Sequence, residues 1–293
     1  MILDLLNYNN TSLNENIFKF RTNASSFDIN YEIKEAVKGN YPQFGLSARE
    51  GLLLVYRFVD ESNWYNLDAF ARGRKVSVNM THITDGERFY DVIVYGPTLT
   101  SLKRLDIEIP DESEGEIVEM NSKRKMMVLG GLNSFGIGCT TSGVMFSNIL
   151  QREFDCEVKK IVFNDANYLD KIHNSLTYDE IPYVDVAILE IDCSRQSEEY
   201  IEKYLDNILT ALGSYAGKII CWLTLPPSKS SKKQKAVKIV EKHDVIFEDL
   251  SFLYDSDYED MCTYSYNFIN DSANMFIFRK ISEDLREILN WNI

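Results

Sequence analysis

The first part of the chain consists of short apolar or alternating runs separated by turn-forming residues. The runs cover residues 50–59, 75–80, 89–96 and 104–109, and Gly, Asp, Asn or Pro residues bound them. Such alternation is typical of strands with one buried face. The stretch "TDG" at 84–86 predicts a hairpin turn between two of these strands. We therefore expect residues 1–112 to form an antiparallel β-sandwich of jelly-roll type.

The pattern changes beyond the polar, acidic stretch "DESEGEIVEMNSK", from which residues 113–123 are interpreted as a linker. In residues 124–293, runs that are apolar on both faces alternate with helical patterns, as in a parallel sheet covered by helices. The expected strands are 125–130, 158–164, 184–191, 218–225 and 244–249, and the expected helices are 141–154, 197–212, 230–242 and 272–289. The fold class is therefore α/β: a sandwich followed by a three-layer α/β/α domain with a five-stranded, mainly parallel sheet.

Composition and charge exclude some kinds of partner and indicate a location. The formal net charge is -14, and 45% of the residues are hydrophobic. An acidic surface repels nucleic acid and anionic membranes, so we expect neither as a partner. We expect no membrane span, because no apolar run is long enough, and the N-terminus lacks the features of a signal peptide. Five cysteines without CxxC spacing favour reduced thiols and a cytoplasmic location. An export signal removed from the sequence stays an open alternative.

The loop that follows the first expected α/β strand carries the most specific motif. "GGLNSFGIGC", residues 130–139, contains glycines at 130, 131, 136 and 138. With the sandwich before it, the pattern V-x-G-x-x-x-x-x-G-x-G resembles the SGNH/GDSL hydrolases, in particular the carbohydrate-esterase-like type with an N-terminal jelly roll. "YDVIVYGPTLTSLKRLDI" (90–107) and "FINDSANMFIFRKI" (268–281) also resemble that group.

The resemblance implies that this chain lacks some of the catalytic residues of the family. The Gly-Asp-Ser of the family falls on Gly130, Gly131 and Leu132. Its oxyanion-hole Asn falls on Ser194, and its Asp-x-x-His pair falls on Asp260 and Thr263. Leucine has no nucleophilic atom, so this chain cannot form the acyl-enzyme of the family at Leu132. The candidate cleft implied in this way consists of Gly131, Leu132, Asn133, Asn164, Asp165, Asp192, Ser194, Arg195 and Thr263.

Other residues offer a relocated mechanism. Ser134 is the best alternative hydroxyl and Cys139 the best alternative thiol. A helix expected from about residue 141 predicts a lowered pKa for that thiol. The sequence places none of the three histidines beside either group, so the base would be an acid, Asp165, Asp192 or Asp260, in a dry cleft. The same acids could instead hold a divalent cation, grip sugar hydroxyls, or be separately solvated or paired.

Two hypotheses remain open at this stage. In the first, which we favour, the protein is non-catalytic or altered and uses the cleft to bind a glycan-like or small ligand, or a partner protein. In the second, it is an ester hydrolase or acyltransferase acting on acylated carbohydrate or small esters with Ser134 or Cys139. We expect no metal and no cofactor in either case, and a homo-oligomer is compatible with both.

Overall fold

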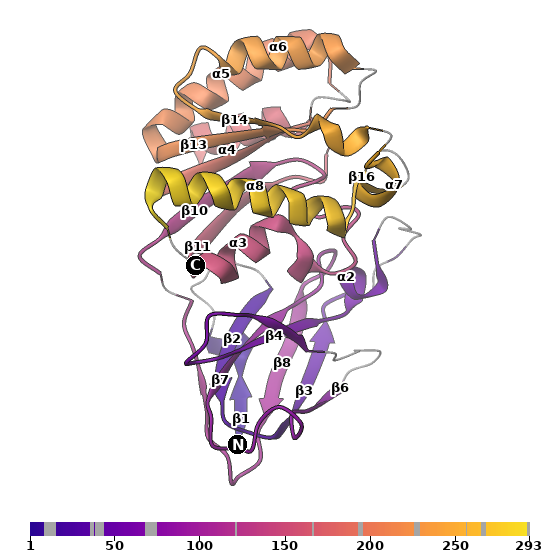
Figure 1. The fold of residues 1–293 in the computed structure, drawn as a ribbon, viewed down its shortest axis with the longest axis vertical. Coiled ribbons are helices and arrows are strands. Elements are labelled where there is room, and N and C mark those ends of the chain that lie inside the picture. Colours follow the sequence, from indigo (N-terminus) through magenta and orange to yellow (C-terminus); the bar gives the residue numbers. More distant parts are fainter. Residues whose placement is uncertain are drawn as a thin grey trace. The chain divides into compact units, whose positions relative to one another are not determined.

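The structure is a computed structural model that divides into two compact units (Figure 1). It describes residues 1–8, 16–35, 38, 44–67, 75–120, 122–165, 167–192, 196–225, 229–255, 257–264 and 268–291. The first unit contains residues 1–121 and 140–143, and the second contains residues 122–139 and 144–292.

The first unit consists of two antiparallel sheets, as expected. One has the strand order β1 (Ile2–Asp4), β8 (Leu102–Glu108), β3 (Ser26–Ile33) and β6 (Lys75–Asn79). The other has the order β5 (Tyr65–Leu67), β4 (Leu53–Phe58), β7 (Tyr90–Tyr95), β2 (Ile17–Thr22) and β9 (Gly115–Ile117). Residues from both sheets, such as Ile29, Ile107, Phe20 and Val92, share one buried core, so the sheets form a sandwich. The short helices α1 (Leu5–Tyr8) and α2 (Leu46–Glu50) lie between strands in the sequence.

Two sequence expectations for this unit are corrected. Gly86 does have a positive φ of 90°, as a turn requires, but the strands on either side of it do not form a hairpin. β6 pairs with β3, whereas β7 pairs with β2 and β4 in the other sheet. The stretch expected as a linker also contains β9, which pairs with β2, so part of it is sheet.

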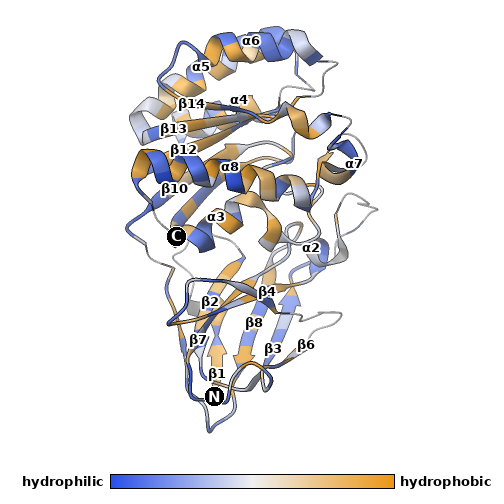
Figure 2. Cartoon of the chain, viewed as in Figure 1, coloured by the Kyte–Doolittle hydropathy of each residue, from blue (hydrophilic) through white to orange (hydrophobic). Residues whose placement is uncertain are grey.

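The second unit is the expected three-layer domain with a parallel five-stranded sheet. The strand order is β11 (Glu157–Val162), β10 (Lys125–Gly130), β12 (Val184–Ile191), β13 (Ala216–Leu223) and β14 (Ile246–Asp249). One face packs on α4 (Tyr168–Tyr178), α5 (Glu198–Tyr215) and α6 (Ser230–Val240), and the other on α3 (Phe146–Phe154) and α8 (Asp271–Leu289). Figure 2 shows the central strands as mostly apolar and α6 and α8 as alternating between apolar and polar residues, as this layering requires.

The remaining elements are short. The 3-10 helix η1 (Ser142–Val144) precedes α3, and η3 (Ser251–Tyr254) and α7 (Glu259–Cys262) follow β14. β15 (Thr263–Tyr264) and β16 (Phe268–Ile269) pair with each other just before α8. Among the described residues, no helix has both the length and the apolar character that a bilayer-crossing segment needs.

The strand order indicates at which edge of this sheet a functional site is to be expected. β11 lies on one side of β10, and β12 to β14 follow on the other side, so the direction of winding reverses between β10 and β12. In open parallel sheets, ligands bind at the carboxyl ends of the strands beside such a reversal. The loops after β10 and β12 are therefore the place to look for chemistry.

Candidate functional site

The glycine-rich loop after β10 is a compact series of turns. Its backbone closes on itself through bonds from Phe135 N to Gly131 O (2.9 Å) and from Ile137 N to Leu132 O (3.1 Å). Gly136 and Gly138 have φ values of 90° and 94°, a region that other residues rarely adopt. The glycines thus give the loop its shape, as its sequence predicts.

A buried carboxylate anchors this loop. Glu190, near the end of β12, is fully buried, and its Oε2 accepts the N–H groups of Gly131 (2.9 Å) and Ser134 (2.8 Å). Its Oε1 accepts the N–H of Asn133 at 3.4 Å. Convergent N–H groups of this kind commonly bind an anion, and here the chain itself supplies the anion.

The surroundings of Glu190 disfavour its ionised form. Burial, and then the nearby charge of Asp192, raise the pKa of Glu190 to about 7, although the Ser134 hydroxyl and the N–H groups of Ser134 and Gly131 lower it. The removal of the carboxylate from water therefore affects its pKa more than the hydrogen bonds do. The expectations from the sequence do not include this role for Glu190. An acidic residue inside an otherwise apolar strand was the available signal.

Tyr168 at the start of α4 braces the same edge. Its hydroxyl donates to the carbonyl of Glu190 (3.0 Å) and accepts the N–H of Asp192 (2.9 Å). A Cβ on Gly131 would lie 2.6 Å from the Tyr168 ring, so the ring packs directly on the glycine. Packing against Tyr168 therefore requires glycine at position 131.

The structure places both candidate nucleophiles inside the protein. Ser134 is 1% exposed and Cys139 is also 1% exposed. The Ser134 hydroxyl faces Glu190, because a Cβ on Gly130 would lie 2.3 Å from Ser134 Oγ and 2.5 Å from Glu190 Oε2. Leu132, on which the resemblance places the nucleophile of the family, is likewise buried.

The expected activation of Cys139 is wrong. The helix expected from residue 141 begins only at Phe146, and burial raises the pKa of the Cys139 thiol instead of lowering it. The Cys139 sulfur accepts a bond of 3.3 Å from the side-chain amide of Asn274, and that amide also caps α3 by accepting the Phe146 N–H (3.0 Å). Cys139 is therefore a packed, structural thiol.

The acids named from the sequence do not gather into one cluster. Asp165 is ion-paired with Lys171 (2.7 Å) and accepts the N–H of Asn167 (2.8 Å), and Lys171 and this N–H lower its pKa. Asn164 beside it is exposed. Among the described residues, no group of three or more His, Cys, Asp or Glu side chains could hold a metal ion. Ser194 and Arg195 lie outside the residues that the structure describes.

The segment before α8 contacts the loop through other residues than those expected. Asp260 is exposed on α7, and the Thr263 hydroxyl donates to the carbonyl of Glu259 (2.8 Å). A Cβ on Gly138 would lie only 2.0 Å from the carbonyl oxygen of Ile269, so β16 is the part that touches the loop. Phe268 and Ile269 cannot transfer protons.

The histidines are engaged elsewhere. His243 contacts Asp206 (2.9 Å), and the His173 ring packs 5.7 Å from the ring of Tyr204. His82 is an exposed turn residue of the other unit. Neither histidine of the α/β unit thus bonds to a residue of the glycine-rich loop.

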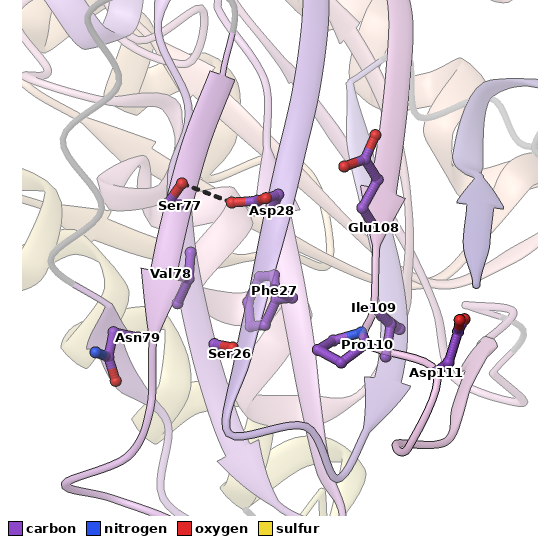
Figure 3. Close-up of a pocket in the computed structure, with 10 residues that line it drawn as sticks. All are labelled: Ser26, Phe27, Asp28, Ser77, Val78, Asn79, Glu108, Ile109, Pro110 and Asp111. Carbon is purple, nitrogen blue, oxygen red and sulfur yellow. Dashed lines mark hydrogen bonds between the residues drawn. The ribbon is translucent and has the colours of Figure 1, made fainter.

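A second concave surface lies on the sandwich. This groove has a volume of about 560 Å³, and Figure 3 shows Asp28, Ser77 and Glu108 on its neighbouring strands. Lys75 (2.7 Å) and the Ser77 hydroxyl (2.5 Å) already occupy the Asp28 carboxylate, and they lower its pKa. The Asp28 carboxylate of this groove is therefore already satisfied within the protein.

Comparison with solved structures identifies the fold. A proposed GDSL-like lipase from Bacteroides ovatus shares 16% identity and a TM-score of 0.75, with 96% of this chain and 87% of that chain covered. A family two carbohydrate esterase from Clostridium thermocellum, in complex with cellohexaose, shares 9% identity and a TM-score of 0.59 over 100% of both chains. A salicylyl-acyltransferase from a tetracycline biosynthetic pathway shares 15% identity and a TM-score of 0.62, covering 95% of this chain and 84% of that chain.

No model of a known protein family and no curated protein matches the sequence. The structural likeness nevertheless extends over both units, and the chain has the fold of the SGNH/GDSL-like hydrolases with a jelly-roll-like sandwich.

Proposed function

We propose that this protein uses the SGNH-type fold for binding, without the Ser–His chemistry of an esterase. The main support for this proposal is that the glycine-rich loop exposes no nucleophilic side chain. Leu132 stands at the position that the resemblance assigns to the nucleophile, and Ser134 and Cys139 are each 1% exposed. A nucleophile must reach the substrate and must lie within hydrogen-bond distance of a base.

The proposed ligand is glycan-like or another small molecule, and the proposed place is the edge of the sheet after β10 and β12. Structural neighbours with this fold include carbohydrate esterases, one of them in complex with cellohexaose, and an acyltransferase. A partner protein in the same cleft, and a second copy of the chain, remain part of this proposal. The buried, free cysteines among the described residues support a cytoplasmic location.

One observation favours the alternative, an ester hydrolase or acyltransferase with Ser134 as its nucleophile. The Ser134 hydroxyl faces a carboxylate whose pKa is about 7, a suitable value for a general base at neutral pH. This alternative requires the loop to open, because both groups are buried.

Two measurements on the same protein separate the candidates. Calorimetric titration with cellohexaose and with an acetylated xylo-oligosaccharide tests binding, and release of p-nitrophenol from its acetate ester tests turnover. The binding function predicts saturable heat and no turnover above the rate without protein. Turnover that Ser134→Ala or Cys139→Ala abolishes, and that the buried control Ser282→Ala preserves, would establish the enzyme instead.

A further inference from the structure

The two oxygens of the Glu190 carboxylate are used unequally. Oε2 accepts two N–H groups at normal distances, from Gly131 (2.9 Å) and Ser134 (2.8 Å). Among the described residues, Oε1 accepts only the N–H of Asn133, at 3.4 Å, near the outer limit of a hydrogen bond. The N–H of Asn133 therefore bonds to Glu190 more weakly than the N–H groups of Gly131 and Ser134 do.

That residue also carries an unsatisfied side chain. Asn133 is 1% exposed, and within the part of the chain that the structure describes neither Nδ2 nor Oδ1 of its amide has a hydrogen-bond partner. A buried primary amide without partners is unfavourable, and native structures keep one only for a reason. Because Asn133 lies in the loop at the carboxyl edge of the sheet, the amide is suited to bond a ligand there.

The surroundings of Glu190 favour proton exchange at this point. On its own strand, Asp192 adds a like charge. From α4, Tyr168 contacts the backbone carbonyl of Glu190, and from β13 the register partner is the apolar Trp222. From the loop come the Ser134 hydroxyl and the N–H donors, and among the described residues no basic side chain forms an ion pair with Glu190. Among the described residues, Glu190 thus has no ion-pair partner that would lower its pKa.

We propose that Glu190 is a proton-operated latch that controls the availability of Asn133 to a ligand. This inference rests on the proposed binding function. When the carboxylate takes up a proton from solvent, the proton goes to Oε1, the oxygen with the single long bond. The new O–H is a donor and cannot accept the Asn133 N–H, so that bond is lost, while Oε2 still accepts the N–H groups of Gly131 and Ser134.

Amide hydrogen exchange followed by NMR between pH 5.5 and 8.5 tests the latch without any ligand. After correction for the intrinsic pH dependence of exchange, protection of the Asn133 amide should fall about tenfold as the pH decreases through about 7, as for the loss of one hydrogen bond. Gly131 and Ser134 should keep their protection. Unchanged protection at Asn133, or an equal loss at all three amides, would overturn the proposal.

Two variants sharpen this measurement. Glu190→Gln should leave the Asn133 amide weakly protected at every pH. With the glutamine Nε2 in the place of Oε1, a donor faces the Asn133 N–H, and that N–H has no acceptor. Asp284→Asn is the matched control: Asp284, on α8, also has a pKa raised by burial, to about 6, and its removal should leave the pH dependence of Asn133 intact. Disappearance of that dependence in Asp284→Asn would sink the assignment to Glu190. The wild-type measurement stands alone if Glu190→Gln does not fold.

Titration with cellohexaose at pH 6 and pH 8 then connects the latch to binding. Affinity should be about tenfold higher at pH 6. A pH-dependent Asn133 amide without any heat of binding would reject the proposed function and leave the latch standing. Binding of equal strength at both pH values would confirm the function and overturn the control by Glu190.

Discussion

The backbone N–H of Ser134 donates to Oε2 of Glu190 at 2.8 Å, across 56 positions of sequence. This contact joins the loop after β10 to the end of β12, the two strands between which the winding of the sheet reverses. A loop of the kind that can receive an external anion is here closed on an internal one. A tertiary contact between distant segments thus fixes the shape of the candidate site.

The close packing around this contact predicts that Gly130→Ala is destabilising. An added Cβ would lie 2.3 Å from Ser134 Oγ and 2.5 Å from Glu190 Oε2, so the loop or the carboxylate must move. We expect the free energy of unfolding to fall by about 1–3 kcal/mol, measured by urea denaturation. Gly213→Ala in α5 is the control, because nothing lies within 4 Å of its added Cβ. That variant should gain about 0.5–1 kcal/mol, and equal effects of the two changes would contradict the packing argument.

The burial of Glu190 predicts a pH-dependent stability with a definite sign. The pKa of this carboxyl is raised from 4.5 to about 7 in the folded chain, so the folded state binds the proton more tightly than the unfolded state. The stabilisation is complete below pH 4.5 and is lost as the pH rises to 7, a total of roughly 3 kcal/mol. Glu190→Gln should remove this loss, so its stability should change less between pH 5 and pH 8.

Asp284 contributes in the same direction, because burial and the nearby charge of Glu248 raise its pKa to about 6. The comparison is therefore best made in the Asp284→Asn background, by urea denaturation at pH 5 and at pH 8. If the stability of the double variant Asp284→Asn/Glu190→Gln depends on pH as strongly as that of Asp284→Asn alone, Glu190 is not the source of the pH dependence.

The environment of Cys139 predicts an unreactive thiol. The thiol is buried, its pKa is raised by that burial, and Asn274 donates to its sulfur. Iodoacetamide at pH 8 should leave Cys139 unmodified in the folded protein and alkylate it rapidly in 6 M urea, as read by peptide mass spectrometry. Cys156, Cys221 and Cys262, which are buried as well, serve as internal references. Selective labelling of Cys139 in the folded state would restore it as a candidate nucleophile.

The sheet and most helices could be predicted from the sequence, because their signals are local. β10 and β12 coincide with the expected strands, and α5 coincides with the expected helix region over most of its length, where Ser197 caps it by accepting the Tyr200 N–H (3.2 Å). The helix α4 was not predicted, although Tyr168, Leu169, Ile172 and Leu176 form its buried face at helical spacing. The polar residues between them obscured the pattern.

The site could be predicted only in part, because its chemistry depends on contacts between distant segments. The glycine-rich loop and its edge of the sheet were identified from the sequence. That Glu190 faces Ser134, and that β16 in place of Thr263 touches Gly138, follows from the packing of β12 and α8. The predicted pKa direction of Cys139 was wrong because burial raises the pKa of the thiol, and because η1 and an extended Met145 separate it from the helix α3.

Asn274 joins the loop to two helices, and its replacement should therefore be costly. Its Oδ1 accepts the Phe146 N–H at the start of α3 (3.0 Å), and its Nδ2 donates to Cys139 Sγ (3.3 Å) and to the carbonyl of Asn270 (3.0 Å). Asn274→Leu keeps a similar volume but leaves the buried Phe146 N–H without an acceptor. We expect a loss of about 1–3 kcal/mol in the free energy of unfolding, together with faster alkylation of Cys139.

Asn207→Ala is the matched control for this change, because Asn207 donates to the Lys203 carbonyl on the exposed surface of α5. It should alter stability by less than about 0.5 kcal/mol. Equal stabilities of Asn274→Leu and Asn207→Ala would mean that the amide is not the cap of α3. A destabilised Asn274→Leu with an unchanged Cys139 alkylation rate would confirm the cap and reject the coupling to the loop.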